Sequence, residues 1–178
     1  GEANFRAFEN VDLQGIPLVY SPFIHHRIVD QANTDLIHVI LNFDTVSDYL
    51  MDLKQEEVRF LTTSSVTGTA IQLASYLGCH KIILVGQDLS FPNRLHYAPG
   101  IDHIEVEEQE KALKEAVVEI ENVSGGKNPT TKKMLHTLQD IENLLQLYQD
   151  KNEFINTSKM GAKIKGTIWK PIEEVFQE

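Results

Sequence analysis

Hydroxyl-bearing side chains crowd one short stretch of the sequence, between an apolar run and a segment with helical spacing. With the backbone N–H groups of the helix start, they would suit a phosphate or a sugar hydroxyl, because ligands of parallel sheets gather where strands end and helices begin. The alternative is a plain helix N-cap, which contributes about 1 kcal/mol and needs only one hydroxyl. The number of hydroxyls favours a binding role for this string: Thr63, Ser64, Ser65 and Thr67.

A polar turn, Gly86, Gln87 and Asp88, ends the apolar run Ile82–Val85. An isolated carboxylate at the carboxyl end of a central strand is costly unless it orients a loop, holds a metal or contacts a ligand hydroxyl. The sequence favours neither of two roles for Asp88, which could hold a loop in place or contact a ligand.

Two further polar residues, His96 and Tyr97, follow that turn closely. A histidine there can move a proton, and a tyrosine can bind a phosphate oxygen. The other histidines lack the spaced Cys, Asp or Glu partners of a zinc site. We therefore predict no metal site among His25, His26, His38, His80, His103 and His136.

The elements that must position these residues begin with short apolar runs rich in β-branched side chains. Such runs predict buried strands of a parallel sheet, at residues 16–20, 36–43, 58–61 and 81–85. We expect an α/β fold, with a Rossmann-like three-layer sheet flanked by helices, as one domain over residues 1–178.

A helix is predicted directly after the hydroxyl string. Its apolar face comprises Ala70, Leu73, Ala74 and Leu77, and Gly78 is the residue type most often found just past a helix end. With strands before and after it, this helix completes a βαβ unit over about thirty residues.

The rest of the chain shows weaker patterns. Glutamates 105, 107, 108 and 110 fit a solvated helix start better than a metal site. We predict a loop at 91–103, a helix at 105–123, a loop at 124–129, a helix from Thr130 or Thr131 to Tyr148 with an apolar stripe, a strand at 154–155, an exposed segment at 161–166 and a short helix from Pro171.

Composition excludes several classes. The formal charge of -10 argues against nucleic acid as a partner, which needs a concentrated basic face. A single cysteine and the lack of a membrane-spanning apolar stretch favour a cytoplasmic setting. The sequence also lacks GxGxxG, Walker, GxSxG and HExxH motifs, so dinucleotide dehydrogenases, P-loop enzymes and common hydrolases lose their usual support.

Several of these segments, taken in order, resemble the motility accessory factor (Maf) family. The resemblance covers most of the chain. It is carried by Pro17–Pro22, Ser64–Val66, Ala70–Ala74, Leu77–Cys79, Ile83–Leu89, His96–Gly100, Thr130–Lys132, Ile155–Thr157 and Gly161–Thr167.

This resemblance implies a glycosyltransferase that moves a nonulosonic acid, of the pseudaminic, legionaminic or sialic type, from a CMP-sugar to Ser or Thr of flagellin. The core also looks like bacterial sialyltransferases, in which a Thr-Ser-Gly-Val string comparable with Thr63–Val66 precedes the helix. The upstream half of such a core is expected to lie outside this chain, which would make the chain the C-terminal part of that core and a part of a larger protein.

The resemblance implies a division of roles and no cofactor. The sialyltransferase base histidine would fall near Thr130, where no imidazole stands, so His96 is the substitute candidate. Asp88 would orient the sugar or the loop. We predict His96 and Asp88 as catalytic residues and a substrate-binding set of Thr63, Ser64, Ser65, Thr67, Gly86, Gln87, Tyr97, Thr130 and Thr131.

Two alternatives remain open. The archaeal 6-hydroxymethylpterin diphosphokinase belongs to the same superfamily and has a comparable Gly-x-Asp turn; that activity would need Mg²⁺, with Asp88 as one ligand. A non-catalytic flagellin-binding module would keep the fold without the reaction.

Overall fold

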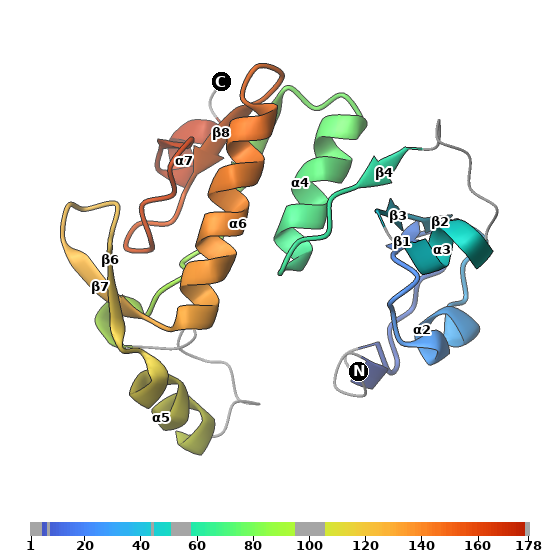
Figure 1. The fold of residues 1–178 in the computed structure, drawn as a ribbon, viewed down its shortest axis with the longest axis horizontal. Helices are drawn as coiled ribbons and strands as arrows, with labels where there is room; N and C mark the ends of the chain where they lie inside the picture. Colours follow the sequence, from blue (N-terminus) through green and yellow to red (C-terminus); the bar gives the residue numbers. More distant parts are fainter. Residues whose placement is uncertain (1–4, 7, 44, 51–57, 95–105, 177–178) are drawn as a thin grey trace. The chain divides into compact units, whose positions relative to one another are not determined.

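The computed structural model describes residues 5–6, 8–43, 45–50, 58–94 and 106–176 (Figure 1). Helices and mostly parallel strand pairs make up the described chain, so the fold is α/β. The chain divides into two compact units, residues 1–62 and 63–178. The single domain expected from the sequence stays a prediction.

The first unit holds two parallel strand pairs, β1 with β2 and β3 with β4. Its small core contains Phe5, Leu18 and Ile28. In chain order the elements are β1 (Leu18–Tyr20), α2 (His26–Gln31), β2 (Ile37–Val39), β3 (Leu41–Asn42), α3 (Thr45–Leu50) and β4 (Arg59–Phe60).

The predicted buried strand at 36–43 was wrong in two respects. It is split at Ile40 into β2 and β3, which pair with different partners, and all three residues of β2 are exposed. Ile40 and Asn42 are the buried residues of this run, and the Asn42 amide donates to the Phe60 carbonyl at 3.1 Å. An apolar run therefore marked a strand but did not reveal its burial, which depends on what packs against it.

The second unit is built on a parallel sheet in the order β5, β8, β9. Two long helices, α4 and α6, lie side by side (Figure 1) and supply most of the core with the strands. The bounds are α4 (Val66–Tyr76), β5 (Lys81–Leu84), α6 (Lys132–Tyr148), β8 (Glu153–Asn156), β9 (Ile168–Trp169) and α7 (Ile172–Val175).

Helix α4 confirms the predicted element but corrects its buried face. Leu77, expected on the apolar face, is 69% exposed, whereas Ile71 and Gln72 are 2% and 1% exposed. The Gln72 amide is buried at low cost because it donates to the Gly68 carbonyl at 3.3 Å. Gly78 follows the helix with φ +85°, as predicted.

Helix α6 confirms both its predicted cap and its predicted stripe. The Thr131 hydroxyl accepts a hydrogen bond from Met134 N at 3.1 Å, which is the N-cap geometry. The stripe lies in the core: Leu138, Ile141 and Leu145 are buried, and Leu135 and Tyr148 pack against them.

The predicted helix at 105–123 was wrong beyond Glu115. Helix α5 spans Val106–Glu115, and Val118–Glu121 forms strand β6 of an antiparallel hairpin with β7 (Lys127–Thr130). The order Val-Glu-Ile-Glu alternates apolar and charged residues with period two, a strand pattern that the helical spacing of Leu113, Val117 and Ile120 concealed. The predicted loop at 124–129 is correct only for the hairpin turn, because β7 already begins at Lys127.

The segment 161–166 was predicted to be exposed, which is wrong for Gly161, Ala162 and Ile164 but correct for Lys163, Lys165 and Gly166. Ala162 and Ile164 are buried in the core of the second unit. The segment is fastened by backbone hydrogen bonds from Ala162 N to Asp88 O and from Lys163 N to Glu121 O, at 2.7 and 2.9 Å. Glycines at both of its ends misled the sequence interpretation.

The strand, helix and strand of the predicted βαβ unit occur in order, but β4 pairs with β3 and β5 pairs with β8. The described strands form separate small sheets. A continuous Rossmann-like three-layer sheet therefore stays a prediction.

Candidate functional site

The hydroxyl string and the turn after β5 meet at the carboxyl edge of the sheet. The Thr67 hydroxyl lies 3.1 Å from Gln87 Oε1 and donates to it. Gly86, with φ +69°, takes a backbone conformation that favours glycine and turns the chain sharply after β5. Two segments that the sequence predicted to form one site are thus in direct contact.

Asp88 is held by partners from the segment after β8 and by Ser90 of its own turn. The Ser158 hydroxyl donates to Asp88 Oδ1, and the Asp88 carbonyl accepts from Ser90 Oγ and Ala162 N at 2.9 and 2.7 Å. Ser158 is itself buried, and its Oγ accepts from Gly161 N at 3.2 Å. The Ser158 hydroxyl therefore fixes the position of the Asp88 carboxylate, while the Asp88 residue stays exposed to a ligand.

Gly161 allows the segment after β8 to approach Asp88 closely, because a Cβ atom at position 161 would lie 2.7 Å from Asp88 Cα and would also overlap Ser158 Oγ. We expect Gly161→Ala to lower the free energy of unfolding by about 1–3 kcal/mol, the usual effect of overpacking, in urea denaturation followed by circular dichroism. Ser124→Ala in the exposed hairpin turn is the control and should stay within about 0.5 kcal/mol. Equal stability of the two variants would contradict the packing described.

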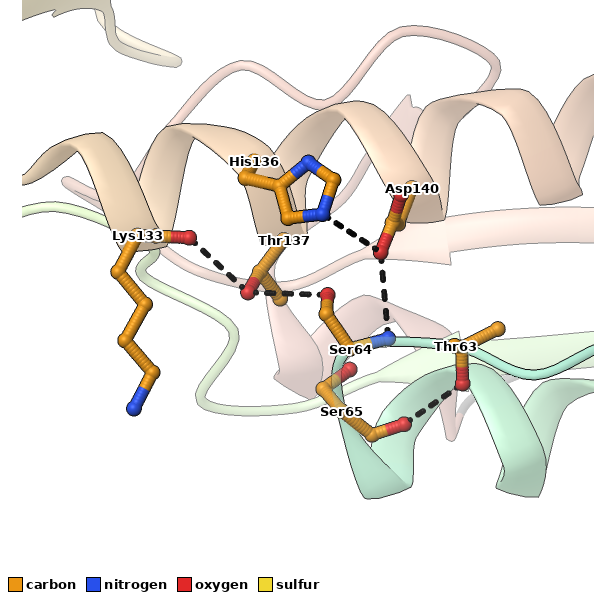
Figure 2. Close-up of polar contacts among 7 residues, drawn as sticks. All are labelled: Thr63, Ser64, Ser65, Lys133, His136, Thr137 and Asp140. Carbon is orange, nitrogen blue, oxygen red and sulfur yellow. Dashed lines mark hydrogen bonds and ion pairs between the residues drawn. The ribbon is translucent and has the colours of Figure 1, made fainter.

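The start of the hydroxyl string faces α6 (Figure 2). Ser64 N donates to Asp140 Oδ2 at 3.2 Å, and the Ser64 hydroxyl donates to Thr137 Oγ1 at 3.3 Å. Ser65 is the N-cap residue of α4, but its side chain makes no capping hydrogen bond, and the Thr63 hydroxyl donates to the Ser65 carbonyl at 2.9 Å. Capping by side chains therefore does not account for the hydroxyls of this string.

The two predicted binding residues before α6 have structural partners. Thr130 is 0% exposed, and its hydroxyl donates to the Leu89 carbonyl at 2.9 Å. Thr131 caps α6 through its hydrogen bond with Met134 N. Ligand contact by these two threonines stays a prediction, and the burial of Thr130 weighs against it.

His96 and Tyr97 lie outside the described residues, so their roles stay predictions. Of glutamates 105, 107, 108 and 110, only Glu110 has a described side chain; it is exposed and lies 3.8 Å from Lys114.

Sequence reasoning missed Ser158 and Asp140, the two residues that hold Asp88 and Ser64. The signal for Ser158 was available: the polar run Asn156–Ser158 follows a predicted parallel strand and so reaches the same edge as the turn after β5. Asp140 carries no such signal, because only the packing of α6 against α4 brings it to Ser64.

Within the described ranges, no three His, Cys, Asp or Glu side chains are grouped so that they could hold a metal ion. No helix in the same ranges is long and apolar enough to cross a membrane.

The family model described as 6-hydroxymethylpterin diphosphokinase MptE-like matches residues 1–94. The matched region includes the hydroxyl string, α4, β5 and the turn that carries Asp88. No curated protein and no solved structure matches the chain.

Proposed function

Because the chain belongs to the family described as 6-hydroxymethylpterin diphosphokinase MptE-like, whose model covers more than half of its length, we propose that it is a transferase that uses a nucleotide-activated donor. Its specific activity, in this proposal, is that of a Maf-type glycosyltransferase, which moves a nonulosonic acid from a CMP-sugar to Ser or Thr of flagellin in the cytoplasm. The motif resemblance along most of the chain, including segments beyond residue 94, supports the sugar over other groups.

The observation that carries the proposal is the contact between Thr67 and Gln87. It joins the hydroxyl string to the turn that presents Asp88, so that hydroxyls, an amide and a carboxylate share one edge of the sheet. Such a set can hydrogen-bond a polyhydroxylated ligand at several points at once. Ser158 fixes the carboxylate in advance, which reduces the ordering cost of binding.

In the proposed reaction, the bond between the anomeric carbon of the sugar and the CMP phosphate oxygen breaks through an oxocarbenium-like state. The acceptor hydroxyl attacks that carbon and loses its proton to His96, while CMP leaves with the bonding electron pair. Tyr97 binds the departing phosphate, and Asp88 orients the sugar. The protein contributes mainly position and charge stabilisation.

Calorimetric titration of the chain with CMP-N-acetylneuraminic acid and with CMP tests the proposal. We expect the CMP-sugar to bind, and radiolabelled sugar to appear on added flagellin. If the chain binds flagellin but does not bind the CMP-sugar, the result would indicate the non-catalytic module instead. Binding of neither nucleotide would contradict the proposed function.

We expect His96→Ala to lower turnover about 10²- to 10⁴-fold, the usual contribution of a general base, while donor binding is spared. Sugar transfer and CMP-sugar titration measured on the same variant separate the two effects. His80→Ala, at an exposed histidine directly before β5, is the control. Unchanged turnover would remove His96 from the mechanism.

The second candidate is diphosphate transfer from ATP to 6-hydroxymethylpterin, which the description of the matching family model favours. Asp88 would then be one ligand of Mg²⁺. Formation of AMP from ATP, dependent on both Mg²⁺ and the pterin, would select this activity over sugar transfer.

A further inference from the structure

Ser64, His136, Thr137 and Asp140 form a polar cluster between the start of α4 and one face of α6, here called the α4–α6 cluster (Figure 2). Asp140 Oδ2 is its centre: it accepts from Ser64 N and lies 3.8 Å from His136 Nε2. The side chain of Asp140 is about one quarter exposed, at 27%, and that of His136 is 68% exposed. A ligand can therefore reach both.

The charge of the cluster opposes a phosphate. A helix start usually attracts anions, but here the Asp140 carboxylate accepts from Ser64 N, two residues before the first residue of α4. Lys133 of α6 contributes its backbone carbonyl to Thr137, and its ammonium group extends away from the cluster (Figure 2). An added phosphate would meet a carboxylate at this position, with repulsion between like charges.

The hydrogen bonds of the cluster leave acceptors facing outward. The Thr137 hydroxyl donates to the Lys133 carbonyl at 3.2 Å, so its oxygen is left to accept the proton of Ser64. The Ser64 oxygen then presents lone pairs, as does the carboxylate of Asp140. His136 Nε2 lies 3.8 Å from Asp140 Oδ2, which is longer than a hydrogen bond and is an ion pair only when the ring is protonated, and the ring is mostly exposed.

We propose that the α4–α6 cluster is a subsite for the hydroxyl groups of a sugar, with Asp140 as the principal acceptor. The subsite does not take the donor phosphate. This inference rests on the proposed function, because it takes the α4–α6 cluster as the part of the same candidate site that binds the sugar and not the nucleotide. Neutral acceptors and one carboxylate recognise O–H donors, which a polyhydroxylated ring supplies and a phosphate does not.

The variant Asp140→Asn tests the subsite, because the amide keeps an oxygen for Ser64 N and removes only the charge. Calorimetry gives the dissociation constants for CMP, CMP-N-acetylneuraminic acid and inorganic phosphate. We expect the advantage of the CMP-sugar over CMP to fall about tenfold or more in this variant, as for loss of a charge-assisted hydrogen bond, with CMP binding unchanged. Glu142→Gln is the matched control, since this α6 carboxylate also accepts a backbone N–H, from Lys165 at 2.9 Å, outside the cluster.

The possible outcomes are distinct. An unchanged CMP-sugar advantage in Asp140→Asn overturns the subsite and leaves the proposed function standing. Tighter binding of phosphate or CMP in that variant also overturns the subsite, because it would identify a phosphate position that Asp140 had opposed. If the unaltered chain binds neither nucleotide, the proposed function and this subsite both fail. Thermal melting of both variants verifies that they are folded.

Discussion

Replacing Asp88 by alanine is expected to lower the rate of sugar transfer about 100-fold or more, with little change in the dissociation constant for CMP. The carboxylate is held by Ser158 at the edge where the hydroxyl string and the turn meet, and misplacing a positioned ligand by about 1 Å costs roughly that factor. Steady-state transfer to flagellin and calorimetry with CMP measure the two quantities.

A second substitution and a control separate chemistry from folding. Asp88→Asn keeps an acceptor for the Ser158 hydroxyl and is expected to retain stability while losing turnover, because the charge is gone. Asp150→Ala, an exposed carboxylate near the start of β8 and so at the opposite edge of the sheet, should leave transfer unchanged. Full activity in both Asp88 variants would exclude a role for this carboxylate in the reaction.

Leu145→Ala is expected to lower the free energy of unfolding by about 2–5 kcal/mol, the usual cost of truncating a fully buried leucine. Leu145 is 0% exposed on α6, in the core that carries the candidate site, and it lies against the segment after β8: a Cβ atom on Gly166 would be 3.3 Å from Leu145 Cβ. The midpoint of urea denaturation measures the loss.

Leu147 on the same helix is the control for this prediction. It is 62% exposed, so Leu147→Ala should change stability by no more than about 0.5 kcal/mol. The pair keeps residue type, helix and substitution constant and varies only burial. A similar loss in both variants would contradict the assignment of the core to the stripe of α6.

The sequence by itself determined the elements whose signals are local. The cap at Thr131, the stripe through Leu138, Ile141 and Leu145, the apolar strand β5 and the glycine after α4 all appear where their patterns predict them. Capping, periodicity and glycine conformation depend on residues a few positions apart, so the local sequence is enough to predict these features. The convergence of the hydroxyl string with the Gly86–Asp88 turn was also predictable, from the rule for ligand sites in parallel sheets.

Only the tertiary structure decided which partners complete the site and which faces are buried. Ser158 and Asp88 are 70 residues apart in the chain, and Ser64 and Asp140 are 76 apart. Contacts at such separations depend on how α6 and the segment after β8 pack. The β6 strand, the buried face of α4 and the burial of Ala162 and Ile164 were mispredicted for the same reason: hydrogen-bond partners and packing surfaces distant in the chain overrode the local pattern.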